Sequence, residues 1–316
     1  MNWKQLISAK RFGMEEFHEE RQENRSEFQR DYDRLIFSAP FRRLQNKTQV
    51  FPLPGSVFVH NRLTHSLEVA SVGRSLGDDV AKALLERHPE LQDSFLPEIG
   101  SIVSAACLAH DLGNPPFGHS GEKAISTFFS EGKGVRLKEK QPNGEQLSPM
   151  EWEDLTHFEG NANAFRILTH QFEGRRRGGF VLTYTTLASI VKYPFSSSLA
   201  GKKSKFGFFV SEEESYRKIA TELGLIQLSE QPLKYARHPL VYLVEAADDI
   251  CYQMMDIEDA HKLKILTTDE TKELYCHFLS PERLKRAQEI CRLVSDTNEQ
   301  IAYLRSSVIG ILIKEC

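Results

Sequence analysis

Residues 108–122 bring two histidines and two carboxylates together around a forced break in a helix. The stretch begins as an apolar segment and then reaches residues 113–116 (Gly-Asn-Pro-Pro), which cannot continue a helix. We therefore expect His110 and Asp111 to lie at a helix end, where adjacent side chains converge on one ion more easily than in mid-helix. A second interpretation stays open, in which His110 and Asp111 are buried beside a loop and only satisfy each other.

The same stretch ends in a second pair, His119 and Glu122, which are three residues apart. On a helix this spacing lets the carboxylate orient the imidazole and raise its basicity. A protonated His119 could then donate its proton to a leaving oxygen.

A third histidine, His65, lies one turn inside a long amphipathic pattern over residues 61–87. Arg62 and Glu68, at i−3 and i+3, make its face polar and able to line a cavity. The alternative is an ordinary packed histidine. The next helix, expected over residues 101–112, is built from small and apolar residues, so its final His-Asp pair needs hydrogen bonds or a metal.

An acidic helix is expected over residues 239–256, with Pro239 in its first turn. Its polar residues fall within a sector of roughly 100°. They are Glu245, Asp248, Asp249, Tyr252 and Asp256. This could be a surface helix, but four like charges with no Lys or Arg between residues 238 and 261 would repel each other. We therefore expect a cation from elsewhere in the structure to face them.

Four of these side chains form a mixed nitrogen and oxygen ligand set: His65, His110, Asp111 and Asp248. We expect one divalent ion, Mn²⁺ or Mg²⁺ first and Fe, Co or Ni as alternatives, although Mg²⁺ prefers oxygen and water. Cys107 and Cys251 lie in apolar helical patterns, the usual place of inert thiols, so we do not expect a structural zinc site. Such an ion would activate water and polarise a phosphoryl group. Arg62, Lys192 and Arg166 lie near these elements in sequence, and they supply the positive charge that a triphosphate requires.

At 316 residues, 40% hydrophobic and 27% charged, the chain is long enough for one large domain or two closely packed ones. Its net charge of −4 provides no overall attraction to nucleic acid or an anionic membrane, so phosphate binding must be local. The five cysteines form no close pairs, as is usual for reduced thiols. With no secretory signal and no apolar run near the ~18 residues that span a bilayer, the sequence predicts a cytoplasmic protein without membrane contact.

Most of the chain carries helical patterns. We expect helices from Ser38, from His157 and over residues 182–191, and a mobile loop over residues 131–150. Residues 49–58 predict a loop or short β-hairpin. Residues 201–209 interleave lysines with aromatic residues and could hold phosphate or stack bases, although a solvated turn is an equal alternative, as it is for the basic residues 175–177.

Taken together, these motifs resemble the HD-domain phosphohydrolases, whose metal site has the order H…HD…D. The resemblance is closest to the deoxyguanosine triphosphate triphosphohydrolase (dGTPase) branch. It rests on an ordered series of segments: residues 41–51, 61–66, 110–122, 157–165, 192–194, 205–207 and 245–256.

The resemblance implies a mostly α-helical HD-domain fold with at most a short β-hairpin near residues 49–58. It implies a single HD-type domain over residues 1–316, with its core at about residues 30–260. Family members are usually longer at the C-terminus, so we expect part of the family fold to be missing. A homo-oligomer, a hexamer in the family, is also implied.

The resemblance assigns the metal to His65, His110, Asp111 and Asp248. His119 becomes the catalytic acid, supported by Glu122 and lying near His157. The remaining assignments concern the substrate. Arg62, Lys192 and Tyr252 would contact the triphosphate, Tyr193 and Asp256 the deoxyribose (Asp256 at its 3′-hydroxyl), and Gln49 and Val50 the base or sugar.

Enzymes of this branch remove intact triphosphate from a deoxynucleoside triphosphate (dNTP). The implied reaction is attack by a metal-bound hydroxide on the α-phosphorus, with His119 protonating the departing 5′-oxygen. We expect dGTP to be preferred, and Tyr193 or residues 44–51 to exclude ribonucleotides. Allosteric dNTP or single-stranded DNA are further possible ligands. Two alternatives remain: an HD-family 5′-nucleotidase or phosphodiesterase, and a non-catalytic regulator that binds nucleotide or single-stranded DNA.

Overall fold

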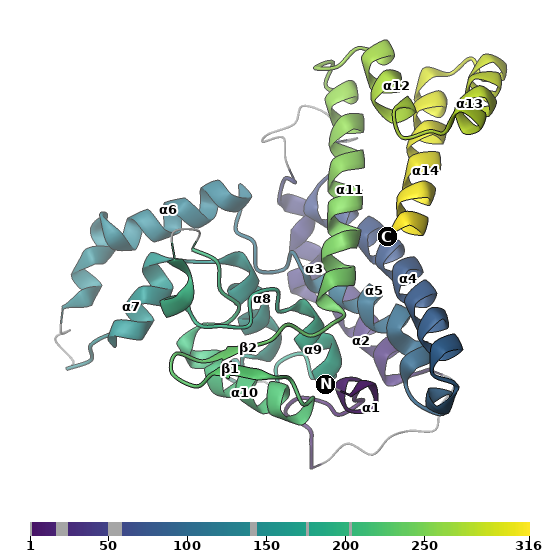
Figure 1. Ribbon diagram of the computed structural model, residues 1–316. Helices are drawn as coiled ribbons and strands as arrows, with labels where there is room; N and C mark the ends of the chain where they lie inside the picture. Colours follow the sequence, from purple (N-terminus) through teal and green to yellow (C-terminus); the bar gives the residue numbers. More distant parts are fainter. Residues whose placement is uncertain (1, 17–24, 50–58, 140–143, 175–176, 202–203) are drawn as a thin grey trace.

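The computed structural model describes residues 2–16, 25–49, 59–139, 144–174, 177–201 and 204–316. This part of the chain is mainly helical, as predicted (Figure 1). The α-helices are α1 (Trp3–Leu6), α2 (Glu27–Ile36), α3 (Ala39–Arg43), α4 (Arg62–Arg87), α5 (Ile99–Ala109), α6 (Gly118–Ser130), α7 (Pro149–Thr156), α8 (Gly160–Thr169), α9 (Tyr184–Ile190), α10 (Glu213–Glu222), α11 (Val241–Lys262), α12 (Thr268–Cys276), α13 (Pro281–Leu293) and α14 (Thr297–Glu315). None of these helices is long and apolar enough to cross a membrane.

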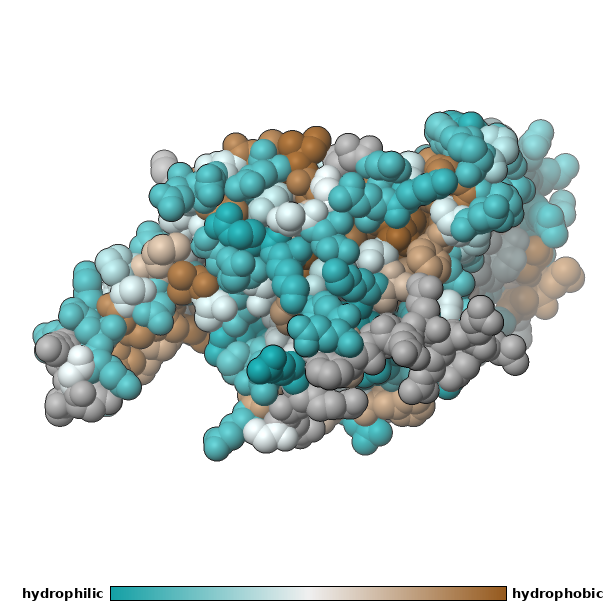
Figure 2. All heavy atoms as spheres, turned by 90° about the horizontal axis from the view of Figure 1, so that it is seen from below, coloured by the Kyte–Doolittle hydropathy of each residue, from teal (hydrophilic) through white to brown (hydrophobic). Residues whose placement is uncertain are grey.

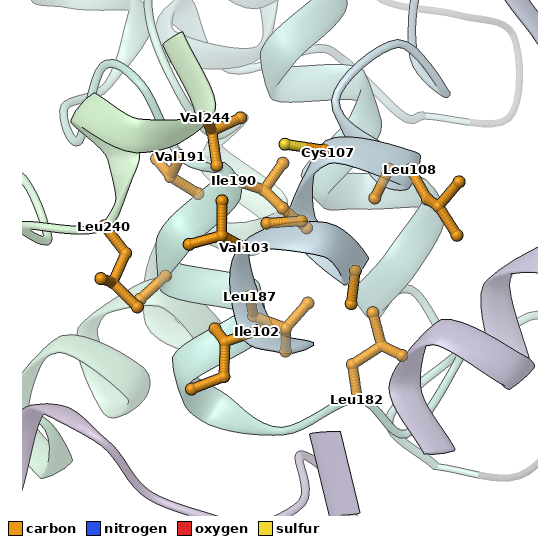
Figure 3. Packing of buried hydrophobic residues seen from close by; sticks show 14 of the residues in the cluster. Ile102, Val103, Cys107, Leu108, Leu182, Leu187, Ile190, Val191, Leu240 and Val244 are labelled. Atoms are coloured by element: carbon orange, nitrogen blue, oxygen red, sulfur yellow. The ribbon is translucent and has the colours of Figure 1, made fainter. Parts of the chain in front are cut away.

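Helix α5 is the centre of the main core, and all of its residues are buried. Helices α2, α4, α9 and α11 pack around it. Figure 3 shows Val103 and Cys107 of α5 among side chains of α9 and α11, including Leu187 and Val244. Because these apolar groups leave water together, truncating one of the larger ones would cost about 2–5 kcal/mol.

Helices α4 and α5 approach each other very closely where two glycines meet. A Cβ on Gly77 would lie 2.7 Å from the Cα of Gly100, so neither position has room for a side chain. This contact fixes α4 against α5 and sets the spacing of the two helices that carry the predicted histidine ligands.

Helix starts follow local capping chemistry. The Asn61 side chain accepts hydrogen bonds from the backbone N–H groups of Leu63 and Thr64, so α4 begins at Arg62, one residue later than predicted. Ser38 caps α3 in the same way and Pro40 lies in its first turn, as predicted.

Two parts of the molecule stand away from the main core. Helices α6 and α7 pack on each other and form an arm at the left of Figures 1 and 2. Helix α11 runs from the core to α12–α14, which bury a smaller cluster that includes Met254, Tyr275 and Val308. The C-terminal region is therefore helical and has a small core of its own.

Several expectations about local structure were wrong. The described strands are β1 (Gln227–Ser229) and β2 (Lys234–Tyr235), which pair antiparallel in a region for which no strand was predicted. The hairpin expected over residues 49–58 falls almost entirely outside the described residues. Residues 131–150 are not only a loop, since Lys133–Lys138 form a 3₁₀-helix and α7 begins at Pro149. His157 ends α7 instead of starting the next helix, which begins at Gly160.

Candidate metal and substrate site

The predicted helix break lies directly before the site. Helix α5 ends at Ala109, and His110 is its C-cap residue. A Cβ on Gly113 would lie 2.1 Å from the backbone nitrogen of Ala164 and from the carbonyl oxygen of Gly160, so the turn after Asp111 packs directly on α8. The break therefore fixes the direction in which His110 and Asp111 point.

His65, His110 and Asp111 each offer one ligand atom, and these atoms lie within 4.8 Å of one another. Asp248 of α11 joins them, because its Oδ1 lies 2.9 Å from His65 Nε2 and 3.6 Å from His110 Nε2. The group is thus built from α4, the end of α5 and α11. The four residues predicted as ligands from the sequence therefore lie close together in the structure.

Hydrogen bonding prepares His110 for a ligand. Its Nδ1 lies 2.6 Å from the carbonyl oxygen of Cys107, which can only accept, so Nδ1 carries a proton. Its Nε2 is buried and has no hydrogen-bond partner among the described residues. A buried nitrogen of this kind is costly unless something binds it.

The site favours positive charge. Burial alone would lower the pKa of His110, but Asp111 and Asp248 outweigh it and raise the pKa to about 9. Burial would raise the pKa of the Asp248 carboxyl, yet His110 and His65 hold it well below its ordinary value. The pKa of Asp111 is also lowered, because His110 and Arg62 outweigh its burial. Carboxylates that favour a proton on His110 would equally favour a metal ion in this position.

The residues present therefore fit a divalent ion. The donor set is two imidazoles and two carboxylates, the mixture that Mn²⁺ and Fe²⁺ accept readily. Two neighbours orient Asp111: Arg62 Nη1 donates to Oδ2 at 2.6 Å, and Asn114 Nδ2 donates to Oδ1. Such second contacts are typical of metal-binding carboxylates.

A cavity of about 440 Å³ opens over this group. Most of the site residues predicted from the sequence line it. They are Gln49, Arg62, His110, Asp111, His119, Glu122, Lys192, Tyr193, Asp248 and Tyr252. His65 lies beneath the lining and is 1% exposed.

His119 and Glu122 form the predicted pair at one wall of the cavity. His119 Nδ1 lies 2.8 Å from Glu122 Oε2, and Glu122 Oε1 accepts a hydrogen bond from the backbone N–H of Gly160 at 2.8 Å. Lys205 lies 3.6 Å from Glu122 and 2.9 Å from Glu159, a fully buried carboxylate. The carboxylate is thus held from three sides, while the His119 side chain is 84% exposed.

Two cations face the acidic helix, and one of them, Lys192, lines the cavity. Lys192 Nζ lies 2.8 Å from Glu245, and so does Arg237 Nη1. The Arg237 guanidinium also lies over the ring of Tyr193. The prediction that α11 needs cations from outside its own sequence is confirmed.

Tyr252 lines the cavity, and Asp256, four residues further along α11, continues this face beyond the lining. The Tyr252 hydroxyl hydrogen-bonds to Asp256. Burial and the neighbouring Asp259 raise the pKa of the Asp256 carboxyl to about 6, despite His65 and His60. Asp256 itself is not among the described residues that line the cavity.

Three other predicted residues take different places. His157 hydrogen-bonds to the carbonyl oxygen of Glu153 in its own helix and is absent from the described lining of the cavity. Arg166 pairs with Glu212 at 2.6 Å and is also absent from that lining. Val50 lies outside the described residues, whereas Gln49 lines the cavity with a buried Oε1 that has no hydrogen-bond partner.

Sequence reasoning missed several polar lining residues, among them Asn114, Asn161 and Lys205. Asn114 and Asn161 stand inside motifs already singled out, and Lys205 ends the basic run before an aromatic segment. Their position in those motifs was the available signal. Residues 202–203 of the basic run lie outside the described part of the chain.

A helical protein that gathers a histidine, a His-Asp pair and a later aspartate around one point has the architecture of an HD-domain protein. The HD domain family matches residues 62–178, which include His65, His110 and Asp111.

Relatives extend the similarity to most of the chain. It is 46% identical to a deoxyguanosinetriphosphate triphosphohydrolase-like protein of Pseudomonas aeruginosa strain PAO1 over 282 residues, 87% of this chain and 60% of the relative. It is 46% identical to a protein of the same name from Synechocystis sp. over 84% of this chain and 61% of that relative. A deoxyguanosinetriphosphate triphosphohydrolase of Yersinia enterocolitica is 36% identical over 88% of this chain and 58% of its own length.

The chain belongs to the HD-domain dGTPase family. It spans about 60% of the length of the curated relatives it matches.

Proposed function

We propose that this chain carries the active site of a metal-dependent dNTP triphosphohydrolase, which releases deoxynucleoside and inorganic triphosphate and prefers dGTP. One observation carries the proposal: a single cavity joins a four-residue metal-ligand group to a carboxylate-held histidine and to Lys192, Tyr193 and Tyr252. The names of the relatives support the choice of substrate.

The charge of the cavity explains why a metal is needed for a polyphosphate substrate. Carboxylates outnumber lysines and arginines in the described lining. The carboxylates are Asp111, Glu122, Glu245 and Asp248, and the cations are Arg62, Lys192 and Lys205. A triphosphate would meet net repulsion here unless a divalent ion added two positive charges.

When bound by His65, His110, Asp111 and Asp248, the ion would supply an activated water and a polarised phosphoryl oxygen. Because Glu122 holds Nδ1 of His119, Nε2 is the ring nitrogen left to face the substrate. Water adds to the α-phosphorus while the bond to the 5′-oxygen breaks. That oxygen takes the Nε2 proton and leaves as the deoxynucleoside hydroxyl.

The part of the lining that carries Lys192 and Tyr252 would hold the triphosphate. Lys192 is half buried and its ion pair with Glu245 fixes the ammonium at the cavity edge, where phosphate oxygens can share it. Tyr252 presents its hydroxyl from the next turns of α11. Tyr193 lies beside Lys192 and supplies the flat surface that would close the pocket against a ribose 2′-hydroxyl.

The test is to incubate the protein with each dNTP and with GTP in Mn²⁺, with EDTA as the control, and to separate the products by chromatography. We expect deoxynucleoside and intact triphosphate, fastest from dGTP, and none from GTP. Release of pyrophosphate or monophosphate would contradict the proposal and indicate another HD-type phosphohydrolase. Nucleotide binding without turnover would contradict it in favour of a non-catalytic regulator.

A further inference from the structure

The His60 imidazole contacts two carboxylates, Asp259 and Glu68, outside the cavity. Its Nδ1 lies 2.7 Å from Asp259 Oδ1 and its backbone N–H donates to Asp259 Oδ2 at 2.9 Å. Its Nε2 lies 3.0 Å from Glu68 Oε1. Both ring nitrogens therefore face acceptors, which suits the doubly protonated imidazolium. Burial lowers the pKa of His60, but Asp259 and Glu68 outweigh burial and raise it to about 9.

These contacts join three parts of the structure. Glu68 belongs to α4, Asp259 to the outer half of α11, and His60 to the stretch that leads into α4. The residues that follow His60 pair with residues 47–48. The Arg62 N–H donates to the carbonyl oxygen of Lys47, and Thr48 forms an isolated bridge with Asn61. Anchoring His60 thus anchors the neighbourhood of Gln49 and Arg62, two residues of the cavity lining.

The contact between His60 and Asp259 lies beside Asp256, the residue predicted to contact the 3′-hydroxyl of the substrate. Asp256 and Asp259 are three residues apart on α11, hence on one face, and their charges interact. A positive charge on His60 offsets both, since His60 bonds to Asp259 and lowers the cost of ionising Asp256.

We propose that His60 is a positioning residue for the deoxyribose: held between Asp259 and Glu68, it fixes Thr48 and Gln49 beside α11 and keeps Asp256 placed to accept the 3′-hydroxyl. The inference rests on the proposed function. His60 touches neither the metal-ligand group nor the phosphate contacts in the described structure, so its effect belongs to binding of the sugar and not to the chemical step.

The test compares His60→Gln with His88→Gln in the Mn²⁺-loaded protein, using dGTP and its 2′,3′-dideoxy analogue. His88 is the matched control, because it also pairs with a carboxylate, Glu90, but is exposed at the far end of α4. We expect His60→Gln to raise the KM for dGTP by about tenfold, the loss of one charge-assisted hydrogen bond, and to leave kcat within about twofold. The KM for the dideoxy analogue should stay unchanged, so discrimination between the two nucleotides is lost.

A charge-rescue variant separates positioning from simple destabilisation. In His60→Gln/Asp259→Asn the unpaired acid beside Asp256 is removed, so we expect much of the dGTP KM to be recovered. If His60→Gln does not fold, Glu68→Gln tests the same clamp and should give a smaller rise in KM for dGTP alone.

The inference would be overturned if folded His60→Gln still discriminated between dGTP and its dideoxy analogue as wild type does. It would also be overturned if the KM rose equally for both nucleotides and rose further in the double variant. Wild-type turnover of dGTP tests the proposed function separately. Its absence would overturn that function and, with it, this inference.

Discussion

The metal-ligand group and the His119–Glu122 pair share one cavity but are built in opposite ways. His65 and Asp111 are 1% and 4% exposed, and they come from helices packed in the main core. His119 is 84% exposed and stands on α6, in the arm that projects from the body (Figure 1). The ligand group is positioned by the fold, whereas the acid is positioned by a few polar contacts.

This difference indicates how the two parts respond to a substrate. Moving a metal ligand means disturbing α4, α5 or α11, which are close-packed. Moving His119 disturbs mainly its contact with Glu122, which is itself held by Gly160 and Lys205. We expect the acid side to adjust around the nucleotide and the metal side to stay fixed. Four measurements test this account, and they are given in order of decreasing expected effect.

The largest effect is expected from Asp111→Asn, which removes one ligand and the partner of Arg62. Turnover of dGTP should fall roughly a thousandfold or more, and the Mn²⁺ affinity by at least about a hundredfold, because both the nucleophile and the phosphoryl polarisation depend on the ion. Titration calorimetry and steady-state rates check this. Asp93→Asn, at an exposed acid, is the control. Unchanged Mn²⁺ binding would remove Asp111 from the ligand group.

His119→Ala should lower kcat by roughly 10²- to 10³-fold, the usual contribution of a general acid. Because His119 lies outside the core, Mn²⁺ affinity and the midpoint of thermal unfolding should stay close to wild type. Single-turnover rates and a metal titration on the same preparation measure both. Retained turnover would show that another group donates the proton.

His60 should make the free energy of unfolding depend on pH. Its pKa is about 9 in the folded chain and near 6.5 when unfolded. The stabilisation is therefore fully present below pH 6.5 and is lost as the pH rises through 9, by an amount on the order of 2–3 kcal/mol. Urea unfolding at pH 6.5 and 9.5 measures it. The prediction fails if His60→Gln loses as much stability over this range as wild type.

The smallest effect is expected from Glu122→Gln. The amide oxygen can still accept from Gly160, but the charge that orients His119 is gone. We expect kcat to fall by about tenfold, less than for His119→Ala. Glu131→Gln, at the exposed end of α6, is the control. A loss as large as that of His119→Ala would mean that Glu122 takes part in proton transfer itself.

The four residues predicted as metal ligands lie close together in the structure, and each was marked by a local signal in the sequence. The break at residues 113–116 fixed the helix end, and the acidic sector of α11 marked Asp248. It did not predict which cations face that sector, because Lys192 and Arg237 reach Glu245 only through tertiary packing. Lys205 was overlooked for the same reason, since its partners Glu122 and Glu159 come from two other segments.

The errors in the fold have similar causes. Strands β1 and β2 are three and two residues long, too short for an alternating pattern to stand out. His157 was expected to open a helix, but Ser148 and Glu151 form a capping box that starts α7 earlier and leaves His157 at its end.

The most direct test of the central claim is to follow the oxygen of water during hydrolysis of dGTP in Mn²⁺. With water labelled with oxygen-18, the account predicts that the label enters the released triphosphate and that the 5′-hydroxyl of deoxyguanosine carries none, because water adds to the α-phosphorus and the 5′-oxygen leaves with a proton from His119. Label in the deoxyguanosine hydroxyl, or in a released monophosphate or pyrophosphate, would contradict the account.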